Sequence, residues 1–235
     1  MSAVPLLRIA GLQAFYGESH ILHGIDLDIR QGELVTLLGR NGSGRTTTLK
    51  SILGLVGRRT GTITFNGHDL LAMPPHRVAR LGIGYCPEER GIFSGLTAEE
   101  NLMLPPQVAE GGMTIAEIYS MFPNLQERRN SPGMRLSGGE QQMLAMARIL
   151  RTGAKLLLLD EITEGLAPVI VKKLGEVIRL LKQRGYTIIL VEQNFRFAAP
   201  LADRHIVLEH GRIVATVTKE ELPTSTDMLH ELLGV

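Results

Sequence analysis

One glycine-rich stretch constrains the fold of this chain more than any other part of its sequence. Residues 39–47 read GRNGSGRTT and follow an apolar run, residues 34–38, that is typical of a buried strand. The next segment, residues 48–53, favours a helix. Strand, glycine-rich turn and helix are the context of a phosphate-binding loop, in which backbone N–H groups converge on an anion at the positive end of the helix. One residue departs from this motif, because Arg45 stands where lysine is expected.

The composition fits a globular protein with a sizeable core. The chain has 235 residues, of which 44% are apolar, enough for one large domain or two small ones. Its net charge of +1 argues against a mainly electrostatic nucleic-acid binder. Cys86 is its single cysteine, so an intrachain disulfide is impossible. Residues 1–8 do not resemble a signal peptide, and no apolar run approaches the ~20 residues of a membrane span, so we expect a soluble chain that reaches a membrane only through a partner.

Two strands are predicted ahead of the glycine-rich loop, over residues 6–10 and 25–29. The second alternates between apolar and polar residues, which is typical of a strand buried on one face. Between the two lie Phe15 and Tyr16, in a chain with no Trp, four Tyr and six Phe. Such an aromatic residue can pack in a loop or can offer a platform on which a purine ring stacks. On these residues alone, the packed loop residue is the favoured interpretation.

Residues 88–134 interrupt an otherwise regular order of strands and helices. Capping boxes at Thr97–Glu100 and Thr114–Glu117 each predict the start of a short helix. We therefore expect a small helical insertion here. Outside it, the pattern predicts strands over residues 61–66, 83–86, 186–191 and 213–217, a helix end followed by a strand over 201–208, and helices over 74–81, 168–184 and 222–233.

A second glycine pair opens a long helix. Ser137 can cap this helix, which is predicted to run to about residue 151, and Gly138 and Gly139 leave backbone N–H groups free for an anion. Residues 155–159 then predict a strand buried on both faces, as in a parallel sheet. Asp160 and Glu161 follow at its carboxyl end, where open α/β sheets bind ligands. One acid there can hold Mg²⁺, and a second can orient or deprotonate an attacking water.

The string LSGGEQ at residues 136–141, just ahead of that strand, is specific to one family. With it, the chain resembles the ATP-binding subunits of ATP-binding cassette (ABC) transporters over almost its whole length. The resemblance implies an α/β fold, with a P-loop NTPase (RecA-like) core, an antiparallel β subdomain and a small α-helical subdomain. It implies a single ABC ATP-binding domain over residues 1–235, with the helical subdomain inserted at about 88–150. It also implies ATP and Mg²⁺ as cofactors, and ATP hydrolysis coupled to transport.

The same resemblance assigns a role to individual positions. In it, Tyr16 matches the aromatic residue that stacks on adenine, and Gln193 falls where most members carry a switch histidine. The residues expected to bind nucleotide are Tyr16, Gly39, Arg40, Asn41, Gly42, Ser43, Gly44, Arg45, Thr46 and Thr47 and, for the ATP held by a second subunit, Ser137, Gly138, Gly139 and Glu140. Those expected to act in catalysis are Glu161, Gln193 and Glu88, and those expected at the metal are Thr46, Asp160 and Glu88.

Three segments resemble one branch of the family more closely. Residues 85–93, 164–168 and 191–194 are similar to the second ATP-binding subunit of branched-chain amino acid importers, and a sister group serves urea and short amides. The resemblance implies a second ABC ATP-binding subunit, identical or different, two membrane permease subunits and, indirectly, a substrate-binding protein, with no nucleic acid. It places the chain peripherally at the cytoplasmic face of the plasma (inner) membrane, docked through residues 88–134. The transported substrate never touches this subunit, so these motifs do not identify it.

Departures from the family pattern leave alternatives open. Glu88 replaces Gln and Gln193 replaces His, as is usual in the branched-chain subfamily, whereas Arg45 in place of Lys and Ile162 in place of Pro are not. Arginine is planar and longer than lysine, so the site on this loop is either slow, leaving most turnover to the opposite site, or nearly normal. A regulatory subunit with negligible hydrolysis is a further alternative. A soluble cassette ATPase of DNA repair or translation is another, although such chains usually carry two cassettes or long coiled-coil or basic insertions.

Overall fold

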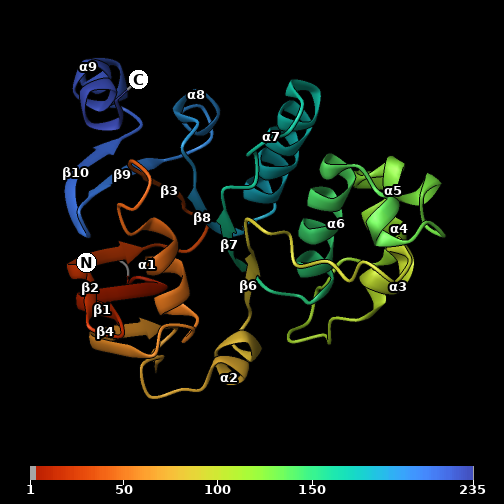
Figure 1. Ribbon diagram of the computed structural model, residues 1–235, viewed down its shortest axis with the longest axis horizontal. Helices are drawn as coiled ribbons and strands as arrows, with labels where there is room; N and C mark the ends of the chain where they lie inside the picture. The colour runs from red at the N-terminus through yellow and green to blue at the C-terminus, as the bar shows by residue number, and fades with distance from the viewer. Residues whose placement is uncertain (1–3, 235) are drawn as a thin grey trace.

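The computed structural model describes residues 4–234. The first three of residues 1–8, which do not resemble a signal peptide, lie outside the described residues. A six-stranded sheet forms the centre of the structure, in the order β10-β9-β3-β8-β7-β6 (Figure 1). Neighbouring strands from β9 to β6 pair in parallel, whereas β10 pairs antiparallel with β9. The strands are β3 (Leu34–Leu38), β6 (Ile83–Cys86), β7 (Leu156–Asp160), β8 (Thr187–Val191), β9 (Arg204–Glu209) and β10 (Arg212–Thr218).

A second, antiparallel sheet has the order β2-β1-β4-β5. It consists of β1 (Leu7–Tyr16), β2 (Ser19–Ile29), β4 (Arg58–Phe65) and β5 (His68–Asp69). The alternation predicted for residues 25–29 is confirmed, since its apolar residues are buried and its aspartates are exposed. The predicted strands 6–10 and 25–29 are too short, because both continue to a tight turn at Gly17. Register shifts between Ile9 and Leu12 and between Ala14 and Phe15 interrupt the alternation there.

Phe15 and Tyr16 therefore lie in β1 and not in a loop, so the interpretation as packed loop residues is wrong. Other boundaries differ as well. The helix predicted over residues 48–53 begins at Arg45, the strand predicted from residue 61 begins at Arg58, and only a strand, starting at Arg204, forms within residues 201–208. A short helix, α8 (Phe195–Ala198), precedes that strand.

The central sheet separates the two larger hydrophobic cores, and β7 contributes to both. Leu157 and Leu159 face the core shared with α6 and α7, whereas Leu156 and Leu158 face the core shared with α1 and the antiparallel sheet. This is the physical reason for four successive leucines in a strand that is buried on both sides. The helices around the sheet are α1 (Arg45–Ile52), α2 (Pro75–Arg80), α7 (Pro168–Gln183) and α9 (Leu222–Leu233).

A group of helices lies at the end of the molecule away from the antiparallel sheet (Figure 1). It consists of α3 (Ala98–Met103), α4 (Ile115–Met121), α5 (Pro123–Glu127) and the long α6 (Gly138–Arg151). The predicted capping boxes are confirmed, because Thr97 and Thr114 each accept a hydrogen bond from the backbone N–H three residues later, and Ser137 does the same for α6. Among the described residues, no helix has the length and apolar character needed to cross a membrane.

Candidate phosphate-binding site

The glycine-rich loop joins β3 to α1 and is shaped by left-handed glycines. Gly42 and Gly44 have φ angles of 78° and 104°, which residues with a side chain rarely adopt. At Gly39, a Cβ atom would lie 2.3 Å from the backbone oxygen of Leu208, so only glycine fits between the loop and β9. Gly44 immediately precedes α1, and the loop thus brings backbone N–H groups to the positive end of a helix.

The loop borders a cleft of about 410 Å³. Tyr16 lies in its lining, and the Tyr16 side chain is 46% exposed and so accessible for stacking. Most of the sequence-predicted residues meet here, together with Ile21, which sequence reasoning missed, and Glu164, which it did not assign to the site. The lining residues are Tyr16, Ile21, Asn41, Gly42, Ser43, Gly44, Arg45, Thr46, Thr47, Glu88, Glu161 and Glu164.

Asp160, the last residue of β7, accepts two hydrogen bonds, one of them from Thr46 in the lining of the cleft. Thr46 Oγ1 donates to Asp160 Oδ1 over 3.0 Å, and the Tyr85 hydroxyl donates to Asp160 Oδ2 over 2.9 Å. Burial raises the pKa of Asp160, and the bonds from Tyr85 and Thr46 oppose that rise. A hydroxyl beside a carboxylate is the oxygen donor set that Mg²⁺ prefers, so Thr46 and Asp160 fit this ion. Tyr85 was missed in the sequence, although it lies in β6, which pairs directly with β7.

Arg45 is buried and links the loop to the carboxyl ends of two strands. Its Nη2 lies 2.7 Å from Glu161 Oε1, directly after β7, and 3.3 Å from Asn41 Oδ1. Its Nη1 donates over 3.0 Å to the backbone oxygen of Glu192, directly after β8. These three bonds use the planar fork of the guanidinium group, and the single ammonium group of lysine cannot reproduce that fork. Arg45 therefore contributes specific hydrogen bonds to the site in addition to its positive charge.

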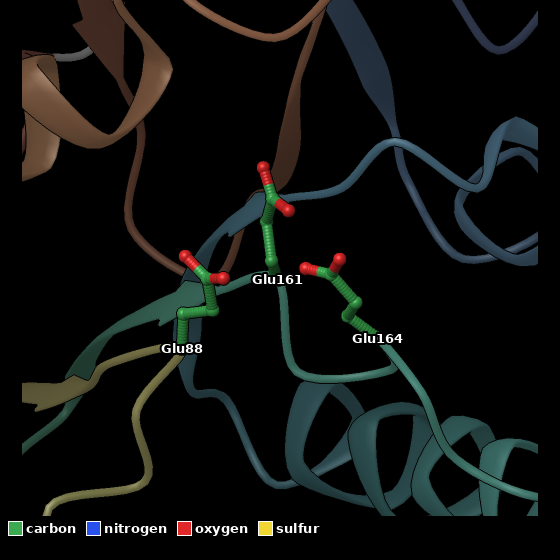
Figure 2. Close-up of side chains that lie close together, drawn as sticks. All are labelled: Glu88, Glu161 and Glu164. Carbon is green, nitrogen blue, oxygen red and sulfur yellow. The ribbon is translucent and has the colours of Figure 1, made fainter.

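Glu161 has an uncommon backbone conformation, with a φ angle of 46°. Its N–H donates over 2.9 Å to the oxygen of Val191, which fixes the turn after β7. Figure 2 shows the carboxyl groups of Glu88 and Glu164 pointing toward one another beside Glu161. Carboxylate oxygens of these three residues lie within 4.8 Å of one another. Burial raises the pKa of Glu161, whereas the positive charge of Arg45 lowers it.

Gln193 does not line the phosphate cleft but borders a neighbouring one of about 360 Å³. Glu161 and Glu164 line both clefts, so Gln193 shares a cleft with two members of the acidic group. Gly39 and Arg40 belong to the glycine-rich loop without lining the cleft.

The signature residues 137–140 lie apart from the phosphate cleft, at the start of α6. Ser137 and Glu140 form a capping box there, while Gly139 packs so closely on Ile170 that a Cβ atom would lie 2.9 Å from its side chain. The glycine of the motif is therefore required by packing between α6 and α7. The chain itself does not bring its signature residues and its own phosphate loop into one cleft.

The fold and the site together define a P-loop nucleotide-binding protein, with a buried aspartate at the end of β7 and a glutamate directly after it. The chain belongs to the ABC transporter family, whose sequence profile matches residues 22–164, more than half of its length.

Individual relatives agree with this assignment. The chain is 39% identical over 232 residues to the high-affinity branched-chain amino acid transport ATP-binding protein BraG of Pseudomonas aeruginosa, a match that covers 97% of this chain and 100% of BraG. It is 39% identical over 225 residues to the probable branched-chain amino acid transport ATP-binding protein LivF of Archaeoglobus fulgidus, covering 92% and 94% of the two chains. Among solved structures, the ATP-binding subunit of an ABC transporter matches with a TM-score of 0.82 and 28% identity, over 98% of this chain and 100% of that one.

Proposed function

We propose that this chain is the ATP-hydrolysing subunit of a membrane importer for branched-chain amino acids. The observation that carries the activity is the phosphate cleft, in which the glycine-rich loop and Glu161 meet and Thr46 is bonded to Asp160. The names of BraG and LivF support the cargo. The test is uptake of labelled leucine by a strain that lacks this chain. Loss of leucine uptake supports the proposal, whereas loss of urea or short-amide uptake alone would assign the chain to the sister group.

Each part of the site has a distinct task in this proposal. The N–H groups of the loop bind the phosphates of ATP, and Thr46 and Asp160 hold Mg²⁺ with Glu88 nearby. The ion neutralises charge on the phosphate oxygens when bound. Glu161 orients the attacking water and accepts its proton, and Gln193 borders the same acidic group. Ser137, Gly138, Gly139 and Glu140 contact the ATP of a second subunit.

The proposed assembly contains a second ABC ATP-binding subunit, identical or different, and two membrane permease subunits, with a substrate-binding protein acting indirectly. The proposed docking to the permease puts the chain at the cytoplasmic face of the membrane, and exposed apolar side chains within residues 88–134 support this docking. Phe93 and Met134 are 51% and 71% exposed, and their segments are joined by a bond from Met134 N to Ser94 O. Residues 1–235 form one ABC domain, with the helical subdomain at about 88–150.

Arg45 makes the site on this chain slow, because its guanidinium group holds the Glu161 carboxylate that must act on water. Replacing Arg45 by lysine is expected to raise turnover at this site about two- to tenfold, the rate equivalent of one hydrogen bond. The measurement is ATP hydrolysis by the assembled complex whose opposite site is inactivated in the partner. Arg77→Lys is the control, since Arg77 is exposed on α2 and does not line the cleft. Equal rates for Arg45→Lys and the native complex would indicate that arginine at this position supports nearly normal hydrolysis. Absence of phosphate release from both complexes would indicate a regulatory subunit.

Tyr16 is expected to stack on the adenine ring from its place at the end of β1. Tyr16→Ala should weaken MgATP binding about 5- to 20-fold, at the lower end of the energies of base stacking because the ring is partly exposed. Tyr16→Phe keeps the ring and should bind as the native chain does. Calorimetric titration with MgATP distinguishes the two variants. Native affinity in Tyr16→Ala would show that adenine lies elsewhere.

A further inference from the structure

Glu192 is a buried acidic residue to which the proposed reaction gives no task. It follows β8 directly, and its side chain is only 2% exposed. Thr163 Oγ1 donates to Glu192 Oε2 over 2.8 Å, and the backbone N–H of Thr163 donates to Glu192 Oε1 over 3.2 Å. Both carboxylate oxygens are therefore engaged by one residue, which is itself 7% exposed.

These bonds join two segments that carry the proposed catalytic residues. Thr163 lies in the turn after β7, between Glu161 and Glu164, whereas Glu192 immediately precedes Gln193. The turn is held to β8 at a second point, because Glu161 N–H donates to Val191 O. Two adjacent residues at the end of β8 thus fix both halves of the turn whose left-handed first residue is Glu161.

The phosphate loop is tied to the same point. The backbone oxygen of Glu192 accepts a hydrogen bond from Arg45 Nη1, so Glu192 contacts the loop through its main chain and the β7 turn through its side chain. Glu192 thus connects three segments, which are the phosphate loop, the turn after β7 and residues 192–194.

Stability alone does not account for a carboxyl group at this position. Burial raises the pKa of Glu192 to about 7, and the bonds from Thr163 only partly oppose this rise. A buried ionisable group is unfavourable compared with an apolar side chain of similar volume. Its two acceptor oxygens are what an apolar side chain lacks, and both of them are used on Thr163.

We propose that Glu192 is a positioning residue, which clamps the turn of residues 161–164 to the end of β8 and so keeps Glu161 in fixed relation to the phosphate loop and to Gln193. The inference rests on the proposed ATPase function. It concerns orientation, so it predicts a change in the rate of hydrolysis with little change in the binding of ATP. Small displacements of a catalytic group are sufficient for large losses of rate.

The test is steady-state ATP hydrolysis by the assembled complex carrying paired variants. Glu192→Ala removes both bonds of the clamp, and Thr163→Val removes the hydroxyl bond. Each should lower kcat about 10- to 100-fold, with the KM for MgATP within about twofold of native. Thr163→Ser keeps both donors. In Glu192→Gln the side-chain amide can accept from the Thr163 N–H and donate to the Thr163 hydroxyl. Both variants should therefore keep kcat within about threefold of native.

Thr187→Val is the matched control, because it removes a buried threonine hydroxyl that accepts a hydrogen bond from Gly32 N–H at the opposite end of β8. Native kcat in Thr163→Val or Glu192→Ala would overturn the inference. A loss in Glu192→Gln as large as in Glu192→Ala would overturn it as well, since charge would then matter instead of the clamp. If Glu192→Ala does not fold, the Thr163→Val and Thr163→Ser pair decides. A native complex without any ATP hydrolysis would instead refute the proposed function itself.

Discussion

Replacing Glu161 by glutamine is expected to lower the rate of ATP hydrolysis about 10²- to 10⁴-fold, the usual contribution of a general base. The amide has nearly the same shape as the carboxyl group, so the turn after β7 and its bond to Val191 are retained. The amide cannot accept a proton from water, and this is the property under test. MgATP binding should persist, because the loop and the Thr46–Asp160 pair are unchanged.

The decisive comparison measures both kcat and the affinity for MgATP in the complex, with the opposite site inactivated. Glu89→Gln is the control, since Glu89 is an exposed glutamate beside Glu88 that does not line the cleft. A Glu161→Gln complex that hydrolyses ATP at the native rate would remove Glu161 from the role of base. Glu164, which lies in the same acidic group, would then be the next carboxylate to examine.

The second large effect is a dependence of stability on pH that originates at Glu192. Its pKa rises from 4.5 to about 7 on folding, mainly through burial, so the folded state binds the proton more tightly. Protonation of Glu192 therefore contributes to the stability of the folded state. This contribution is fully present below pH 4.5 and is lost as pH rises toward 7. A shift of this size corresponds to about 3 kcal/mol in the free energy of unfolding.

Glu192→Gln cannot titrate and should lack this component. Denaturant unfolding of the native chain and the variant across pH 4 to 8 gives the difference in free energy of unfolding at each pH. That difference should change by about 3 kcal/mol, with the variant gaining relative to the native chain as pH rises. Glu209→Gln, which removes an exposed carboxyl group, is the control. A flat difference for Glu192→Gln would show that the buried carboxyl does not titrate in this window.

Features encoded by neighbouring residues were predictable from the sequence. The loop of residues 39–47, the buried strand before Asp160 and the helix caps at Thr97 and Thr114 follow from short patterns, and the fold class followed from their order. The extent of β1 was not predictable, because bulges interrupt the alternation on which the prediction depends.

The parts of the site that could not be predicted from the sequence depend on contacts between segments that are distant in the chain. The Arg45–Glu161 bond joins residues 116 positions apart, and the Thr163–Glu192 bond joins residues 29 apart. No local pattern specifies either contact, since both arise from the strand order that places β8 between β3 and β7. The sequence thus indicated which residues carry the chemistry, but it did not indicate that Arg45 bonds to Glu161 or that Glu192 holds the turn beside it.

The alternating leucines of β7 have a mechanical consequence. Leu157 and Leu159 pack in the core shared with α6 and α7, and Leu156 and Leu158 pack in the core shared with α1 and the antiparallel sheet. Moving β7 would therefore disturb both cores. Asp160 and Glu161 are carried at its tip. A displacement of α6 would therefore change the packing of Leu157 and Leu159 in the strand that ends at Asp160.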